Sequence, residues 1–393
     1  MGFKRYAIIT LMLPLLMAQN ALANDDEEFK QFLKQQQGEF SQFQQQQLKE
    51  FEDFVKAWRQ AENEYKQAIS QKWRKVELPS KKVWVSYSED LNTRTSIDYD
   101  KGTVKVEFRN PSAHSSKNSD ANSSKLEINK AKVELYKLAN QTPMQALKSD
   151  PVYIRTTEKI TYNTIDDTET QANASRLLAP VMVKKLIETQ QPNVDVQPEV
   201  TSIVYTLPKK SLPQKAKPFL TEVNKQAKRW NVDPALLLAV IHTESSFNPM
   251  ARSPIPAFGL MQIVPSTAGK DVSALLHGEP LLLSPDYLYQ PQNNIEAGSA
   301  YLHILDQRYF KSVRNEESRN LLCIAAYNIG AGNVAKTLTG TKSLSRAAIA
   351  ANLMSPEQIH QKLLRDLPAD ETRNYLKKVL KRSNDYQQSI KGI

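Results

Sequence analysis

Glu244 is the residue of this chain with the clearest potential for acid–base chemistry. It follows a segment that begins with Asp233-Pro234, an N-cap and a first-turn proline, and that is apolar throughout residues 236–241. A helix that is apolar on every face is buried. Burial and the dipole at a helix C-terminus both disfavour the charged carboxyl, so both raise the pKa of Glu244. Such a carboxyl suits a general acid in glycosidic cleavage, although a glutamate in a last helical turn is, taken alone, more often solvated.

Three later segments accompany this glutamate: Gly259-Leu260-Met261-Gln262, Ala326-Tyr327-Asn328 and Glu371-Thr372-Arg373-Asn374-Tyr375. Together with Glu244-Ser245-Ser246-Phe247-Asn248-Pro249, and in this order, they resemble the soluble lytic transglycosylase family of lysozyme-like enzymes over about residues 212–390. The segments 82–85, 98–104 and 267–272 are also similar to the membrane-bound lytic murein transglycosylase C family.

The resemblance implies a substrate, a reaction and a set of roles. The substrate is the glycan strand of peptidoglycan, and the reaction is a non-hydrolytic cleavage between N-acetylmuramic acid and N-acetylglucosamine that leaves a 1,6-anhydro end. It implies no cofactor and no metal. Tyr375 resembles the tyrosine that orients the acid Glu244. The substrate-binding residues implied by the resemblance are Ser245, Ser253, Met261, Gln262, Tyr327 and Asn328. Ile255 stands where relatives often carry a second serine, which leaves the sugar contacts of that loop open.

The distribution of carboxylates agrees with a single acid. Residues 245–270 contain neither Asp nor Glu, whereas ordinary glycosidases use two carboxylates. A transglycosylase needs one, because the 6-hydroxyl of the sugar replaces water. Asp271 or Glu296 would have to arrive by folding. Two alternatives stay open: a hydrolytic muramidase, and a non-catalytic scaffold that binds the cell wall. For Ser245, a local capping role is the alternative to a sugar contact. For Met261 and Tyr327, a role in the core of a helical domain is an equally supported alternative.

The elements that must position these residues are helices. Prolines 208, 213 and 218 among lysines mark a linker, and the period is helical from there to the end. We expect helices at 219–230, from 234 onward, and at 292–310, 318–329 and 370–385. The fold class predicted is α+β: a small α+β N-terminal domain at 78–207, then an all-helical lysozyme-like domain at 208–393. Gly330-Ala331-Gly332 matches a relaxed dinucleotide-binding pattern but follows a predicted helix, which argues against that function.

Period-two alternation marks the N-terminal domain. Apolar residues alternate at 83–87, 97–99 and 104–108, and Asp100-Lys101-Gly102 between the last two predicts a hairpin turn. A calcium loop at Asp98, Asp100 and Gly102 is the less favoured interpretation, because the acidic spacing does not continue. Residues 110–125 predict a loop, 126–149 and 173–190 predict helices, and 200–207 predicts another strand.

The segment 24–77 is rich in Gln, Glu and Lys, and its apolar residues recur at helical spacing. Gly38 weakens this helix by about 1 kcal/mol and is a point where it can divide. Two interpretations are equally supported: a helix that binds a protein partner, and a helix packed on its own domain.

The first 23 residues read as a secretory signal. Lys4 and Arg5 precede an apolar run, and Ala21-Leu22-Ala23 forms a small-x-small cleavage site. An uncleaved anchor is the alternative. No cysteine follows the run, so we expect no lipid anchor and a periplasmic protein, with peripheral association with the outer membrane as a variant. The single cysteine, Cys323, excludes an internal disulfide and a multi-cysteine metal site, and we expect it to be a buried thiol.

The composition bounds the remaining functions. The chain has 393 residues, 40% of them hydrophobic and 24% charged, which supports packed cores and two or three domains. The formal charge is +10. The C-terminal stretch is basic at Lys377, Lys378, Lys381 and Arg382. Because we expect export, we interpret it as a solvated helix face or as attraction to anionic envelope polymers, with no nucleic-acid partner.

Overall fold

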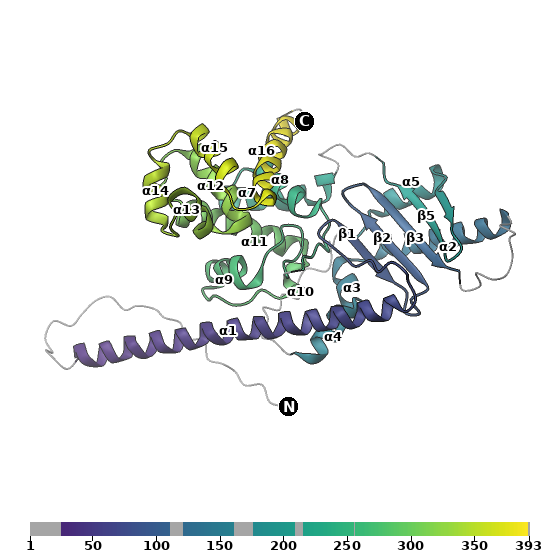
Figure 1. Cartoon of the computed structure of the whole chain (residues 1–393), viewed down its shortest axis with the longest axis horizontal. Helices are drawn as coiled ribbons and strands as arrows, with labels where there is room; N and C mark the ends of the chain where they lie inside the picture. The colour runs from purple at the N-terminus through teal and green to yellow at the C-terminus, as the bar shows by residue number, and fades with distance from the viewer. Residues whose placement is uncertain (1–24, 111–120, 161–175, 209–214, 255, 392–393) are drawn as a thin grey trace. The chain divides into compact units, whose positions relative to one another are not determined.

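The computed structural model describes residues 25–110, 121–160, 176–208, 215–254 and 256–391 (Figure 1). The chain divides into two compact units at Leu48/Lys49. The predictions for the signal segment 1–23, for Pro213 and for Ile255 lie outside the described residues. All strands, and all helices after α1, belong to the second unit. The domain boundaries given above stay a prediction.

The first helix, α1 (Asp25–Ser70), passes Gly38 without a break and ends seven residues before the predicted limit. Its side chains from Phe51 onward include a buried apolar row within the second unit, comprising Phe51, Phe54, Trp58, Ala61, Tyr65 and Ile69. The ring of Trp58 packs edge-on against that of Phe258 with 5.6 Å between the ring centroids, and the rings of Tyr65 and Tyr87 pack in the same way at 6.1 Å. This half of α1 therefore packs on its own chain. A protein partner for the helix stays a prediction.

The sheet is antiparallel, with the order β1-β2-β3-β5-β4. Its strands are β1 (Val83–Tyr87), β2 (Thr93–Asp98), β3 (Thr103–Arg109), β4 (Asn193–Val196) and β5 (Val200–Thr206). In the central register Val104 lies opposite Ile97 and Tyr205, and all three are fully buried. The β2–β3 hairpin is confirmed: Asp98 Oδ1 accepts from the backbone amides of Asp100 and Lys101. Across the described residues no cluster of acidic, His or Cys side chains is suited to a metal ion.

Four helices belong to the sheet domain: α2 (Ala121–Asn140), α3 (Pro143–Lys148), α4 (Pro151–Lys159) and α5 (Pro180–Thr189). The single helix predicted at 126–149 is two helices, because Thr142 and Gln145 form a capping box that starts a new one. The helix predicted from 173 starts at Pro180, where proline occupies the first helical position. In Figure 1, α2 packs on β3 and β5 and also contacts α5.

In the described residues after β5 the regular elements are helices, and two isolated bridges join Phe258 to Arg252 and to Ile263. The elements are the 3₁₀ turn η1 (Lys217–Phe219), α7 (Leu220–Trp230), α8 (Pro234–Ser245), the π turn η2 (Pro265–Gly269), α9 (Lys270–His277), α10 (Pro285–Leu288), α11 (Pro291–Ile304), the π turn η3 (Leu305–Tyr309), α12 (Glu316–Ile329), α13 (Ala331–Thr339), α14 (Leu344–Ala351), α15 (Pro356–Asp366) and α16 (Asp370–Lys391).

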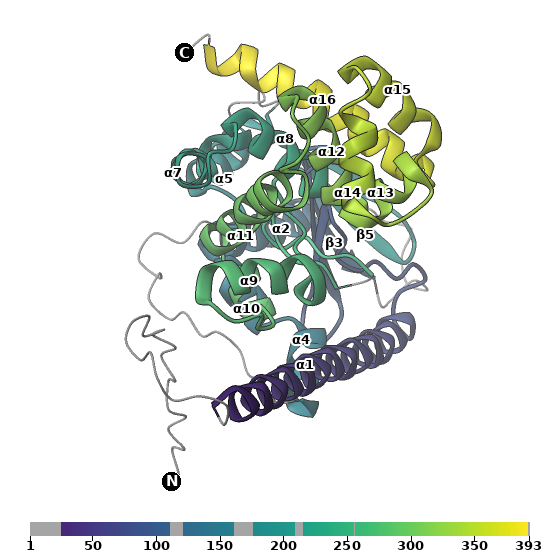
Figure 2. The same ribbon diagram turned by 90° about the vertical axis from the view of Figure 1, so that its left-hand side faces the viewer.

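Figures 1 and 2 both show α8 beside α16, and this pair forms the most extensive helix contact of the domain. Cys323 is buried in α12, as predicted. Gly330 lies between α12 and α13, so the dinucleotide-like pattern follows a helix, as expected. None of the described helices combines the length and apolar character that crossing a membrane requires.

Candidate functional site

Helix α8 holds Glu244 in its last turn. Asp233 caps the helix by accepting from the amide of Ala235 at 2.7 Å, with Pro234 at the first position. Every residue from Ala235 to His242 is buried, so the helix is apolar and enclosed on all faces, as the sequence predicted. Glu244 is itself only 5% exposed. The candidate acid is therefore fixed to the interior of the domain.

The chain turns sharply after Glu244. Ser246 and Phe247 have φ values of 52° and 67°, and two adjacent non-glycine residues in the left-handed region are unusual. Ser245 Oγ supports the turn by donating to the Ile241 carbonyl and accepting from the Phe247 amide. Phe247 stacks on Phe219 at 6.0 Å. Local strain of this kind, held in place by packing, is characteristic of functional sites.

Four groups act on the Glu244 carboxyl. Lys81 Nζ lies 3.5 Å from its Oε2. The Tyr375 hydroxyl lies near the carboxyl but is buried and has no partner in hydrogen-bonding geometry within the described structure. Tyr327 and Glu371 complete the surroundings.

Burial raises the pKa of the Glu244 carboxyl, while Lys81 and Tyr375 act in the opposite direction. Burial, followed by the nearby carboxyl charge, also raises the pKa of both Tyr327 and Tyr375 well above the usual value of 10. Both tyrosines therefore stay protonated. The site thus contains a buried carboxyl, two neutral hydroxyls and one ammonium, and the exposed Glu371 carboxylate acts on it as well.

Gln262 occupies the tight turn that follows residue 258. Its Nε2 donates to the carbonyls of Ala251 and Gly259, and its Oε1 is a buried acceptor without a partner in the described structure. Asn294, from α11, holds this turn by donating to the Phe258 carbonyl at 2.8 Å and accepting from the Met261 amide at 2.7 Å. A buried polar atom without a partner needs an explanation, and a substrate amide would provide one here.

The other predicted site residues differ in accessibility. Ser245 is fully buried and uses its hydroxyl locally, which is the capping alternative stated above. Met261 is also fully buried and packs on Gly298, where an added Cβ would lie 2.2 Å from its sulfur. These two side chains offer no surface to a sugar in this structure. Ser253 and Asn328 are partly exposed, and the Tyr327 hydroxyl donates to the Met261 carbonyl at 2.9 Å.

Folding does not bring the two anticipated carboxylates to Glu244. Asp271 accepts from the Tyr309 hydroxyl at 2.7 Å, and Glu296 pairs with Arg229. The carboxylate whose charge acts on Glu244 is Glu371, an exposed residue in the first turn of α16. Sequence reasoning included Glu371 in a motif but did not place it near the acid.

Sequence reasoning also missed the sheet domain's part in the site. Asn248 Nδ2 donates to the carbonyls of Ser80 and Lys81 at 3.4 and 3.3 Å, and Ser246 Oγ donates to Asp100 Oδ1 at 2.7 Å. These contacts join residues 146 to 168 positions apart. No local pattern could reveal them, although Ser80, Lys81 and Asp100 all flank segments with clear strand periodicity.

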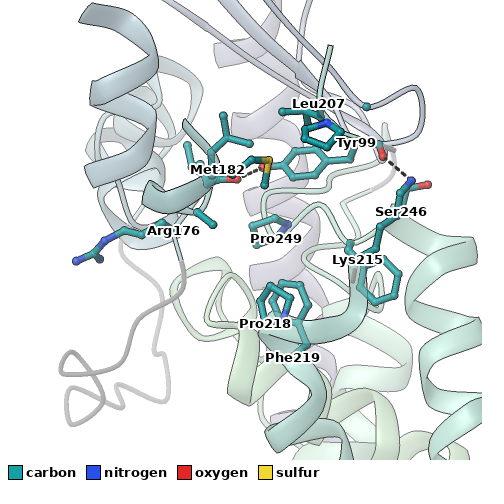
Figure 3. Close-up of a pocket in the computed structure, with 15 residues that line it drawn as sticks. Tyr99, Arg176, Met182, Leu207, Lys215, Pro218, Phe219, Ser246 and Pro249 are labelled. Atoms are coloured by element: carbon teal, nitrogen blue, oxygen red, sulfur yellow. Dashed lines mark hydrogen bonds between the residues drawn. The ribbon is translucent and has the colours of Figure 1, made fainter. Parts of the chain in front are cut away.

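A separate cavity of about 110 Å³ lies beside the residues that follow α8 (Figure 3). It is lined mainly by apolar side chains, including Met182, Phe219 and Tyr99. The Tyr99 hydroxyl donates to the Leu177 carbonyl, and Lys215 Nζ donates to the Tyr99 carbonyl. The Glu244 side chain is not part of its lining, so this cavity is distinct from the acid site.

His242 lies two residues before Glu244 in α8, and its burial is expected to make the folded state less stable in acid. Burial, followed by the charge of Arg382, lowers the pKa of His242 from 6.5 to about 3. In the unfolded chain His242 binds a proton below about pH 6.5, whereas in the folded chain it stays neutral down to about pH 3. The free energy of unfolding therefore falls as the pH is lowered through this interval. Between pH 7 and pH 5 we expect the wild type to lose about 2 kcal/mol more unfolding free energy than His242→Gln, measured by urea denaturation. Equal losses would contradict the prediction.

The site described above is a buried glutamate of raised pKa at the end of an enclosed helix in a helical domain. Comparison with known protein families shows which class of protein has this domain. The Transglycosylase SLT domain model matches residues 222–350. The model of the membrane-bound lytic murein transglycosylase C N-terminal domain matches residues 46–156.

Similar proteins agree with both matches. Membrane-bound lytic murein transglycosylase C of Sodalis glossinidius is 33% identical over 79% of this chain and 84% of its own length. The protein of that name from Yersinia pestis is 32% identical over 80% and 85%. The chain belongs to the membrane-bound lytic murein transglycosylase C family, which is a family of enzymes.

Among solved structures, the lytic transglycosylase Slt of Pseudomonas aeruginosa is 30% identical over 44% of this chain and 24% of that chain, with a TM-score of 0.35. The 70 kDa soluble lytic transglycosylase of Escherichia coli is 20% identical over 68% and 44%, with a TM-score of 0.33. The chain thus spans less than half the length of either of these proteins.

Proposed function

We propose that this chain cleaves the β-1,4 bond between N-acetylmuramic acid and N-acetylglucosamine in peptidoglycan glycan strands without water, leaving 1,6-anhydromuramoyl ends. The observation that carries the proposal is the Glu244 carboxyl, which is buried at the end of α8 and has a raised pKa. The names of the family and of its relatives supply the substrate class.

Glu244 acts twice in this mechanism. Its protonated carboxyl gives a proton to the glycosidic oxygen as the bond from the anomeric carbon to that oxygen breaks, with an oxocarbenium-like transition state. The 6-hydroxyl oxygen of the same sugar then bonds to the anomeric carbon, and its proton passes to the Glu244 carboxylate. The acid is regenerated, no water is consumed, and no cofactor or metal is required.

The neighbouring residues take supporting roles. The Tyr375 hydroxyl orients the carboxyl and stays a donor, since its pKa is raised by burial and by Glu244. The unpaired Oε1 of Gln262 accepts from an amide of the substrate. Tyr327, Asn328 and Ser253 border the reacting sugar. Ser245 and Met261 support the site from within the core, because both are fully buried.

The test is mass spectrometry of glycan strands digested by the purified protein. Anhydromuramoyl ends are the expected product. If all new ends are reducing ends, the chain is a hydrolytic muramidase, with Glu371 as the candidate second carboxylate. An absence of turnover on strands that a known transglycosylase cleaves would leave a non-catalytic scaffold as the function.

We also infer that the protein works in the periplasm after removal of residues 1–23, with peripheral association with the outer membrane as a variant. The support is the order of charged, apolar and small residues at the start of the sequence. Cell fractionation tests this: release of the protein with the periplasmic contents is expected, and a requirement for detergent would contradict it.

A further inference from the structure

Lys81 lies two residues before the first residue of strand β1 and contacts the candidate acid of the helical domain. Its Nζ lies 3.5 Å from Glu244 Oε2, and the Lys81 side chain is 39% exposed against 7% for Glu244. In the described part of the chain no other ammonium or guanidinium lies within ion-pair distance of this carboxyl. The positive charge at the acid thus comes from the sheet domain.

The backbone that carries Lys81 is fastened to the turn after the acid. The Lys81 carbonyl accepts from Asn248 Nδ2, and Asn248 itself is fully buried. Ser80 braces the same segment, because its Oγ accepts from the Val83 amide and its own amide donates to the Val83 carbonyl. The side chain of a surface lysine normally samples many conformations. The main chain of Lys81, however, is held near Glu244 by the hydrogen bond from Asn248.

A second contact joins the two domains beside the first. Asp100, in the β2–β3 turn, accepts from Ser246 Oγ and pairs with Lys82 Nζ at 3.0 Å. Lys82 therefore secures the same interface without an ion pair to Glu244. The adjacent lysines have separable roles, one toward the acid and one toward the turn that follows it.

We propose that Lys81 is a positioning residue of the transglycosylase site, which holds the Glu244 carboxyl and stabilises its ionised form between proton donation and proton return. This inference rests on the proposed function. The groups that face Glu244 are Lys81 from the segment before β1, Tyr327 from α12, and Tyr375 and Glu371 from α16.

The charges of these groups define what Lys81 does. Glu371 repels a carboxylate, whereas Lys81 and Tyr375 both favour the ionised acid. Tyr375 is neutral, so Lys81 is the group in this set that favours the ionised acid with a full positive charge. An interaction that strengthens as Glu244 loses its proton accelerates the chemical step, whereas one that is equal in both states improves binding alone. Lys81 therefore acts on kcat and leaves KM nearly unchanged.

The experiment compares three variants of the full chain on soluble glycan strands: Lys81→Met, Lys81→Arg and Lys82→Met. For Lys81→Met we expect kcat to fall about 10- to 100-fold with KM changed less than threefold. Lys81→Met removes a positive charge that favours the ionised Glu244 carboxyl, so the pKa of this carboxyl rises. The alkaline limb of the kcat profile, where the acid loses its proton, therefore moves to higher pH by about one unit. Lys81→Arg keeps the charge and restores most of both properties.

Lys82→Met is the matched control. It removes the ion pair with Asp100 but leaves Lys81 in place, so its alkaline limb coincides with that of the wild type. An equal shift in both Met variants would assign the effect to a loosened domain contact and overturn the proposal. An unchanged kcat and pH profile for Lys81→Met would overturn it as well.

Failure of the proposed function is distinguishable from failure of this inference. If the wild type forms anhydro ends and Lys81→Met has an unchanged kcat and pH profile, the proposed function stands and only the role of Lys81 is rejected. A double-mutant cycle of Lys81→Met and Glu244→Gln, read from urea unfolding at pH 7, tests the contact without turnover. A measurable coupling supports the Lys81–Glu244 interaction, and additive effects contradict it.

Discussion

Glu244→Gln is expected to lower turnover of glycan strands by about 10²–10⁴-fold, because glutamine can neither donate the proton nor take it back. The same variant is expected to be more stable than the wild type at pH 7. The pKa of Glu244 is raised by burial above its usual 4.5, so the folded state loses stability as the pH rises through the folded-state pKa. Glutamine resembles the protonated carboxyl and escapes that loss. Turnover is measured by release of muropeptides, and stability by thermal unfolding.

Glu371→Gln is the matched control for this experiment. Glu371 is exposed and lies in the first turn of α16, and its charge acts on the same carboxyl. A single-acid mechanism predicts that this variant keeps most of the activity. If it abolishes turnover as completely as Glu244→Gln does, a two-carboxylate mechanism applies instead. A Glu244→Gln protein less stable than the wild type at pH 7 would contradict the burial argument.

Gly259→Ala is expected to lower the free energy of unfolding by about 2–5 kcal/mol. Gly259 has a φ of 75°, and an added Cβ would lie 2.4 Å from both Asn294 Nδ2 and the Leu288 carbonyl oxygen. The new methyl group would displace the asparagine that holds the Met261 amide. We therefore expect activity to fall with stability, since Gln262 belongs to the same turn. Urea denaturation and a turnover assay measure the two effects.

Gly278→Ala separates backbone strain from steric conflict. Gly278 has a similar φ of 80°, but an added Cβ would meet no atom within 4 Å. Its replacement by alanine is expected to lower the unfolding free energy by about 1 kcal/mol and to leave activity unchanged. Equal losses at both glycines would show that the packing around Asn294 yields to the methyl group.

Local sequence signals predicted much of the fold. The enclosed character of α8, its start at Asp233-Pro234 and the hairpin turn before Gly102 all follow from short-range rules, and the structure confirms them. The same rules missed the break at Thr142-Pro143, although the capping box that causes it is visible in the sequence. The strand β4 was missed because only Val194 and Val196 carry its pattern, and its four residues are mostly exposed.

The surroundings of Glu244 were harder to predict from the sequence than the fold. The position of Glu244 followed from the apolar run that precedes it, whereas its charged neighbours come from segments remote in the chain. Lys81 and Asn248, 167 positions apart, meet only because the sheet domain packs on the end of α8. For Met261 and Ser245 the resemblance implied a sugar contact, and a core role and a local capping role were the alternatives. Packing encloses both side chains, which agrees with those alternatives.

The paired left-handed residues Ser246 and Phe247 have a consequence for insertions and deletions. The chain turns back at once after the acid, and Asn248 must then meet the backbone of Lys81 while Ser246 meets Asp100. One residue added or removed between Glu244 and Asn248 would shift both contacts out of register. Changes in chain length are far better tolerated in the turn at 197–199 between β4 and β5, where all three residues are exposed.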